Sequence, residues 1–199
     1  MGKNFVITIA RGFGSRGKEI GSELAKLYGI NCYEHGILTL ASQMSGIDRS
    51  LFAAADERLT KPSIMDALKG EAAITNEQLF DYQAQIIRGL AFSESCVIVG
   101  KCADYILKDL DNVFSFYIEA PRAYCLENIM RKMEVTEEEA HELITATDKR
   151  RAAYYKYYSG GNYWTNPVNY DMTLNTEKVG KENVIRIIKA YVDMRMEEK

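Results

Sequence analysis

The sequence has 199 residues and is short of proline, histidine and long apolar runs. Its three prolines and 14 glycines exclude a collagen-like or low-complexity chain. No apolar run approaches the roughly 20 residues that a membrane helix needs, so we expect no membrane partner. The two histidines, His35 and His141, are distant from each other and offer no Ser-His-Asp or Cys-His arrangement.

Cysteine is also sparse, and its spacing limits the chemistry of the chain. The four cysteines contain no C-x-x-C pair, which indicates reduced thiols and a cytoplasmic location rather than a disulfide framework or a zinc site. With 25 basic and 28 acidic residues, the formal net charge is −3. That balance argues against a protein that coats nucleic acid, although it allows a local basic patch.

Short apolar runs alternate with longer amphipathic segments, which is the pattern of βαβ units and a mostly parallel sheet. The strand-like runs lie at residues 5–10, 30–33, 96–99, 113–118 and 170–175. Helical periodicity occupies residues 20–28, parts of 37–75, 75–91, 104–110, a segment after Pro121, 136–147 and 184–191. No linker rich in Gly, Ser or Pro divides the chain, so we expect one domain over residues 1–199.

Capping signals mark where several of these helices begin. Thr75-x-x-Gln78 and Thr136-x-x-Glu139 are capping boxes, in which two side chains satisfy backbone N–H groups reciprocally. Asp48 can cap a helix whose apolar side holds Leu51, Phe52, Ala55 and Leu59. The segment Lys61-Pro62-Ser63 then interrupts the helical pattern.

The most specific motif is the glycine loop between the first strand and the first helix. Its residues fit the phosphate-loop spacing G-x-x-x-x-G-K and are Gly12, Phe13, Gly14, Ser15, Arg16, Gly17 and Lys18. In such a loop, backbone N–H groups and the helix N-terminus cradle phosphate oxygens, and the lysine reaches the terminal phosphates. We therefore expect ATP at this loop, with Lys18 and Arg16 as its cations.

The residue after the lysine departs from the usual motif. Ser or Thr normally follows and holds Mg²⁺, but Glu19 stands here, and its charge would repel phosphates unless a cation lies between them. The nearest hydroxyl that could contact magnesium is that of Ser15. The same segment also fits the dinucleotide fingerprint G-x-G-x-x-G, with Glu34 near the expected acidic position, but Lys18 would be surplus in a dinucleotide site.

Two features of the C-terminal half extend the candidate site. Arg122 follows a predicted strand, at the end where α/β proteins bind ligands. Asp148 and Arg151 share one helix face, where the carboxylate could hold the guanidinium for a phosphate. A cluster of tyrosines with Trp164, over residues 154–170, could stack on a base, but packing within a lid or at a homodimer contact is the favoured interpretation.

In several segments, in order along nearly the whole chain, the sequence resembles the cytidylate-kinase-like family of P-loop kinases. The matching segments are 6–11 with the glycine loop through Gly21, 32–36, 97–107, Asp148-x-x-Arg151 with the tyrosines after it, and 170–176. The resemblance implies a P-loop NTPase fold, a three-layer α/β/α sandwich around a central five-stranded parallel sheet. It also implies a helical acceptor-side insertion at 36–75 and a lid at 133–168.

The resemblance further implies transfer of the ATP γ-phosphoryl group to a nucleoside monophosphate or a similar small acceptor, with Mg²⁺. Arg151 would then close over the transferring group. Lys101, and Arg122 with it, would hold the acceptor, and Glu34 would orient its base or sugar. Where the family has the arginine of a Gly-Arg motif, this chain has Lys101, which lacks the bidentate fork.

A further family arginine, a few residues beyond the second strand, is replaced by Thr39 or Leu40. The replaced arginines and the missing loop hydroxyl support an alternative of a different class. In that alternative the chain is a nucleotide- or phosphate-binding module that no longer catalyses transfer.

Overall fold

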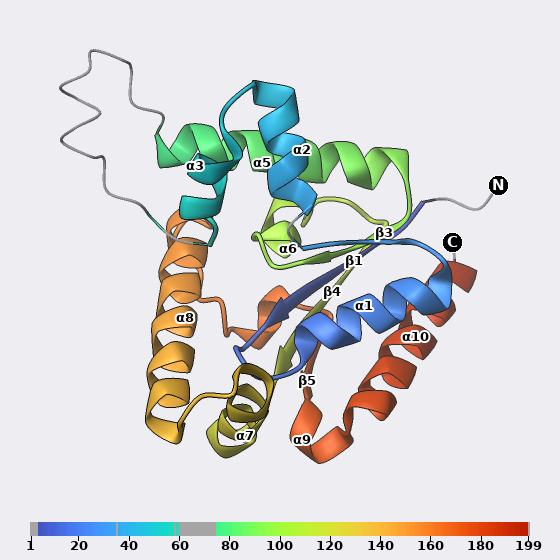
Figure 1. Ribbon diagram of the computed structural model, residues 1–199. Coiled ribbons are helices and arrows are strands. Elements are labelled where there is room, and N and C mark those ends of the chain that lie inside the picture. Colours follow the sequence, from blue (N-terminus) through green and yellow to red (C-terminus); the bar gives the residue numbers. More distant parts are fainter. Residues whose placement is uncertain (1–3, 35, 58, 60–74, 199) are drawn as a thin grey trace, which may run out of the picture.

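A computed structural model describes residues 4–34, 36–57, 59 and 75–198 of the chain. Its centre is a five-stranded sheet in the order β2-β3-β1-β4-β5, with every neighbouring pair parallel (Figure 1). The strands are β1 (Val6–Arg11), β2 (Asn31–Tyr33), β3 (Cys96–Val99), β4 (Val113–Glu119) and β5 (Met172–Asn175). The predicted α/β class and the five-stranded parallel sheet are confirmed.

Helices connect the strands and cover both faces of the sheet. They are α1 (Gly17–Tyr28), α2 (Gly36–Ser45), α3 (Arg49–Ala54), α5 (Asn76–Ser93), α6 (Ala103–Ile106), α7 (Arg122–Met133), α8 (Glu137–Tyr158), α9 (Thr176–Val179) and α10 (Lys181–Glu197). The capping boxes at Thr75 and Thr136 form as predicted, and the Asp48 side chain accepts the Ser50 N–H at the start of α3. None of the described helices is long and apolar enough to cross a membrane.

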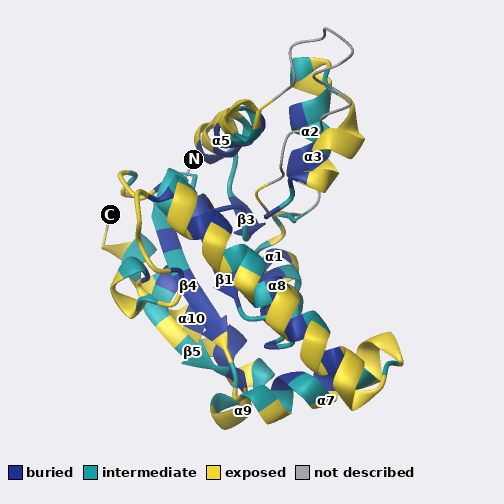
Figure 2. Ribbon diagram, turned by 90° about the vertical axis from the view of Figure 1, so that its left-hand side faces the viewer, coloured by how far each residue is buried: buried dark blue, intermediate teal, exposed yellow. Residues whose placement is uncertain are grey.

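Alternating side chains of the strands divide the core into two faces. Ile7 and Ile9 of β1 point to the face covered by α1 and α10, where they pack with Leu24, Phe116 and Ile188. The opposite face carries α5 and α6, which pack on a second cluster, made of Val6, Ile37, Ile87, Ala91, Cys96, Ile98, Ala103 and Leu107. Helices on both faces of one sheet make the expected three-layer α/β/α sandwich. Strands β1 and β3 are buried along their whole length (Figure 2).

The first part of the predicted insertion forms the helices α2 and α3, which lie beside α5 (Figure 1). Phe52 of α3 is fully buried against Leu38, Ala41 and Leu79, so the predicted apolar side of α3 is only partly correct. Leu51 and Leu59, which the sequence placed on the same side, are exposed instead. Residues 58 and 60–74, with the predicted break at Lys61-Pro62-Ser63, lie outside the described residues.

The predicted lid region contains one long helix, α8, which continues 11 residues past Thr147, where the sequence pattern ends. Its N-terminal half packs on α7 through Ile129, Ala140 and Ile144. Its C-terminal half meets α5, because the ring of Tyr158 stacks on Phe80 with 3.8 Å between centroids. Helix α8 therefore contacts α7 through its N-terminal half and α5 through its C-terminal half.

Most of the aromatic cluster is packed inside the fold rather than displayed for a ligand. Tyr154, Tyr155, Trp164 and Tyr170 are buried around Tyr117 of β4, although Tyr157 and Tyr163 are exposed. The Tyr155 hydroxyl donates to Asp104 Oδ2 at 2.7 Å, and burial raises the pKa of Asp104 to about 6. This supports the structural interpretation of the cluster. All four cysteines, each within the described part of the chain, are unpaired.

Candidate phosphate-binding site

A cavity of about 780 Å³ opens beside the glycine loop, which follows the C-terminal end of β1 and leads into α1. In parallel α/β sheets, this is the edge at which ligands bind. The loop needs its glycines for steric reasons: Gly14 has a φ of 90°, and a Cβ there would lie 2.7 Å from the Cys125 carbonyl oxygen. The loop is therefore held tightly against α7 while one side of it faces the cavity.

The N-terminus of α1, where the sequence predicts phosphate binding, faces the cavity. Arg16 caps the helix in a left-handed conformation, with a φ of 68° and no side-chain capping bond. The N–H groups of a helix's first turn have no partner within the helix, and their dipoles favour an anion. Arg16, Gly17 and Lys18 all line the cavity, so this first turn is placed to meet a ligand there.

Two ion pairs neutralise side chains at the loop. Lys18 Nζ lies 2.5 Å from Glu34 Oε2, which places the acidic end of β2 beside the loop lysine. Arg16 Nη2 lies 2.9 Å from Glu19 Oε2, so the carboxylate that follows the lysine is compensated. Both pairs are partly exposed, and such pairs are weak, so an incoming polyphosphate can compete for their cations.

The Ser15 side chain is not directed at the cavity. It is fully buried, and its hydroxyl donates to the Gly12 carbonyl oxygen at 2.8 Å. Ser15 is absent from the lining residues, and the described residues contain no group of three or more His, Cys, Asp or Glu that could hold a metal. The loop hydroxyl thus closes the loop on itself in this conformation.

The cavity is strongly basic even though the whole chain has a net charge of −3. Eight basic side chains line it, and they are Arg11, Arg16, Lys18, Lys101, Arg131, Lys132, Arg150 and Arg151. Four acidic side chains, Glu19, Glu34, Asp56 and Glu57, line it as well, which leaves a formal excess of four positive charges. A cleft with this excess favours anionic ligands.

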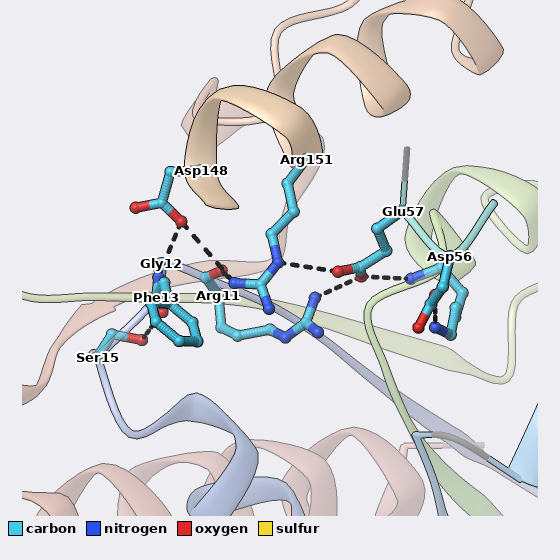
Figure 3. Close-up of polar contacts among 9 residues, drawn as sticks. Arg11, Gly12, Phe13, Ser15, Asp56, Glu57, Asp148 and Arg151 are labelled. Carbon is cyan, nitrogen blue, oxygen red and sulfur yellow. Dashed lines mark hydrogen bonds and ion pairs between the residues drawn. The ribbon is translucent and has the colours of Figure 1, made fainter. Parts of the chain in front are cut away.

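The centre of the cavity wall is a buried carboxylate, Glu57, held between two arginines (Figure 3). Its Oε1 accepts from Arg11 Nη1 at 2.6 Å, and its Oε2 accepts from Arg151 Nε at 2.8 Å. Burial alone would raise the pKa of Glu57, but the charges of Arg11 and Arg151 outweigh it and lower the pKa to about 2. Glu57 is therefore ionised and connects β1, α8 and the segment after α3.

Lys101, the predicted acceptor residue, lies on the same wall and is 3% exposed. Its ammonium pairs with Asp56, and its backbone N–H donates to Glu57 Oε1 at 3.1 Å. Burial lowers the pKa of Lys101 to about 7, and the positive charge of Arg11 adds to this effect. The structure thus brings Lys101 into the cavity but already gives it a carboxylate partner.

Asp148 and Arg151 contact the glycine loop from α8. The N–H of Phe13 donates to Asp148 Oδ1 at 2.9 Å, and Arg151 Nη1 lies 3.8 Å from the same oxygen. Arg151 Nη1 also donates to the Arg11 carbonyl oxygen at 3.2 Å (Figure 3). Burial raises the pKa of Asp148 above its ordinary value. The predicted sharing of one helix face is correct, and that face meets both the loop and Glu57.

Arg122 is a further candidate residue that does not face the cavity. It begins α7, and its Nη2 donates to the His141 carbonyl oxygen and to the Thr145 hydroxyl, both on α8. It does not line the cavity beside the glycine loop. In this conformation it joins α7 to α8.

Three residues of the site, Arg11, Asp56 and Glu57, were not predicted from the sequence. Arg11 ends a buried strand directly before the glycine loop, and this position was the available signal. Asp56 and Glu57 sit in an ordinary charged stretch, and nothing local distinguishes them from solvated helix residues. Their partners are 45 and 46 residues away along the chain, so only the fold reveals them.

Comparison with known proteins agrees with this geometry. The model of the cytidylate kinase-like family matches residues 6–178. A structure of an uncharacterized protein from Eubacterium ventriosum is similar, with a TM-score of 0.74 and 26% identity over 96% of this chain and 99% of that one. No curated protein matches the sequence.

Two kinases share the fold at lower identity. A gluconokinase from Sinorhizobium meliloti has a TM-score of 0.58 and 11% identity, over 100% of this chain and 97% of its own. A shikimate kinase from Bacteroides thetaiotaomicron has a TM-score of 0.55 and 9% identity, over 95% of this chain and 98% of its own. At these identities the likeness concerns the fold alone.

The parallel α/β fold and the match to the family model support a phosphotransferase of the P-loop kinase type. The family match covers most of the chain. The chain belongs to the cytidylate kinase-like family.

Proposed function

We propose that the protein transfers the γ-phosphoryl group of ATP to a nucleoside monophosphate or a similar small acceptor. The observation that carries this proposal is the position of the glycine loop. Lys18 and the first turn of α1 face a cavity with an excess of basic side chains. Phosphoryl transfer asks mainly for positioning and charge neutralisation, and this arrangement can supply both.

The proposed roles follow from the positions around the cavity. Residues 12–19 bind the donor phosphates, and Lys18 and Arg16 neutralise their charge. Arg151 stabilises the transferring group from α8, while Asp148 holds the loop through the Phe13 N–H. Lys101 and Glu34 contact the acceptor, since both line the same cavity. We leave Arg122 out of these roles because its guanidinium is engaged with α8.

Magnesium fits this site as a companion of the nucleotide rather than as a resident ion. Mg²⁺ usually keeps several waters and binds one or two carboxylates together with substrate phosphates. The buried Ser15 hydroxyl does not fit the role of a ligand in this conformation, whereas Glu19 and Glu34 line the cavity beside the loop. When bound, the ion would neutralise charge on the phosphates, and these two carboxylates are the groups that would hold it.

The test is a panel of nucleoside monophosphates and small alcohols, each incubated with Mg-ATP and followed by ADP formation. We expect turnover with at least one acceptor and its loss in Lys18→Ala. Glu23→Gln serves as the matched control, because Glu23 is a partly exposed residue of α1 that pairs with Lys26 and does not line the cavity. ATP binding without transfer to any acceptor would favour the alternative, a binding module that has lost catalysis.

The dinucleotide alternative predicts a different result. NAD would then bind with an affinity that survives the loss of Lys18, and a calorimetric titration of the Lys18→Ala variant measures this directly. We further propose a cytoplasmic location, which the unpaired cysteines support. A homodimer contact that involves the aromatic cluster at residues 154–170 stays a prediction.

A further inference from the structure

The Glu57 carboxylate occupies a site built for an anion. Two guanidinium groups and one backbone N–H converge on it, from Arg11, Arg151 and Lys101, at 2.6 to 3.1 Å. The backbone N–H belongs to a turn in which Gly100, Lys101 and Cys102 have φ values of 77°, 62° and 53°. Left-handed turns of this kind present N–H groups as an anion-binding concavity.

The carboxylates that fill this region formally balance its positive charge. Three cations, Arg11, Lys101 and Arg151, face three carboxylates, Asp56, Glu57 and Asp148, all within ion-pair distance. A ligand phosphate that enters here must therefore replace a carboxylate of the chain. Without Asp56 and Glu57, three cations would face one carboxylate, a formal charge of +2 that matches a phosphate dianion.

Two further observations favour Asp56 and Glu57 as the groups that move. They are adjacent in the sequence, so one displacement of this segment frees Arg11 and Lys101 from their carboxylates and leaves Arg151 with Asp148 alone. Glu57 also has a φ of 49°, a left-handed conformation that costs a non-glycine residue roughly 1 kcal/mol or more. Moving the segment would relieve that strain, whereas Arg11 and Arg151 are anchored in β1 and α8.

We propose that Glu57 is an internal substitute for a ligand phosphate, which takes its place on Arg11, Arg151 and the Lys101 N–H. The chain then competes with its own ligand for this anion site. The identity of that phosphate, from the donor or from the acceptor, rests on the proposed function. The existence of the anion site does not rest on the proposed function, because a measurement of phosphate binding tests it without any transfer reaction.

The test compares the affinity for orthophosphate of the wild type, Glu57→Gln and the control Glu23→Gln by titration calorimetry. Glu57→Gln removes the competing charge and keeps the shape, so we expect orthophosphate to bind at least about tenfold more tightly, while Glu23→Gln leaves the affinity unchanged. An unchanged or weaker affinity in Glu57→Gln would overturn the proposal and make Glu57 a positioning residue for the arginines.

Two double variants separate this site from the glycine loop. We expect the tighter binding to disappear in Glu57→Gln/Arg151→Gln and to persist in Glu57→Gln/Lys18→Ala. The reverse result would place the phosphate on the loop and refute the proposal. Hydrogen exchange of the wild type covers the case in which Glu57→Gln does not fold. Orthophosphate should speed exchange in residues 49–57, and slower or unchanged exchange counts against displacement.

Nucleotides distinguish the two sources of the phosphate. If it is the terminal phosphoryl group of the donor, Glu57→Gln should tighten binding of a non-hydrolysable ATP analogue but not of ADP. If it belongs to the acceptor, a nucleoside monophosphate should show the gain. A gain for none of these ligands contradicts the proposal. If the orthophosphate gain is present while phosphoryl transfer is absent in all conditions, the proposed function fails and the anion site stands.

Discussion

Gly100→Ala is the substitution that most directly probes the buried ion-pair centre. Gly100 has a φ of 77°, and an added Cβ would overlap both Glu57 Oε1 and Arg11 Nη1. The change therefore combines two effects. A left-handed alanine costs roughly 1–2 kcal/mol. The second effect is the weakening of the Arg11–Glu57 pair, whose side-chain ends can shift, and its upper limit is the roughly 3–5 kcal/mol lost when one partner of a buried pair is removed.

Gly46→Ala isolates the first of these effects. Gly46 has a φ of 72°, close to that of Gly100, but none of the described atoms lies within 4 Å of a Cβ built there. We expect Gly46→Ala to lose roughly 1–2 kcal/mol of unfolding free energy and Gly100→Ala to lose clearly more, up to about 7 kcal/mol. In a chain of this size, the largest difference of about 5 kcal/mol corresponds to a Tm lower by roughly 10–20 °C.

Urea denaturation followed by circular dichroism measures both losses, and thermal scans give the Tm values. The two variants must be compared at neutral pH, where Glu57 is ionised. Equal losses in Gly100→Ala and Gly46→Ala would refute the reasoning, since they would show that the Arg11–Glu57 pair is not fixed in the position described.

Three further predictions concern titration and the loop. The pKa of Glu57 is lowered to about 2, so the stabilising effect of its ionised form is present above about pH 4.5 and is lost as the pH falls toward 2. In Glu57→Gln, the unfolding free energy should therefore lose about 3 kcal/mol of this dependence on acid pH. Denaturation curves measured at each pH test this. The pKa of Asp104 is raised to about 6, so stability is lost as the pH rises from about 4 through 6. Asp104→Asn should therefore raise the unfolding free energy at pH 7 by about 1–3 kcal/mol, and a decrease would show that the Tyr155 contact matters more than burial. Asp148→Asn should weaken ATP binding and speed hydrogen exchange at Phe13, because an amide oxygen holds that N–H less strongly than a carboxylate; unchanged exchange would contradict the contact.

The sequence predicted those parts of the fold that local interactions determine. Thr75, Thr136 and Asp48 cap their helices as expected because a cap depends only on residues within one turn. The C-terminal end of helix α8 was not predicted, because its apolar periodicity stops near Thr147 and only Asp148 and Arg151 were placed on a helix beyond it. Beyond that point, tertiary contacts of Tyr154 and Tyr155 stabilise a stretch that is otherwise charged.

The residues of the candidate site also divide into those that a local motif predicts and those that only distant contacts reveal. The glycine loop is one continuous segment, so its spacing was sufficient to place Lys18 at the cavity. Glu57 was not predictable, because its partners Arg11 and Arg151 are 46 and 94 residues away. The position of Arg122 at a strand end suggested a ligand contact, but the packing of α8 beside α7 gives its guanidinium other acceptors.

The central claim is that the glycine loop binds the donor phosphates for transfer. The most direct measurement follows label from γ-labelled ATP to an acceptor, in the wild type and in Lys18→Ala, with Glu23→Gln as the control. We predict a labelled acceptor with the wild type and the control, and a rate lower by roughly 100-fold or more with Lys18→Ala. Equal transfer by Lys18→Ala, or bound ATP that labels no acceptor, would contradict the account.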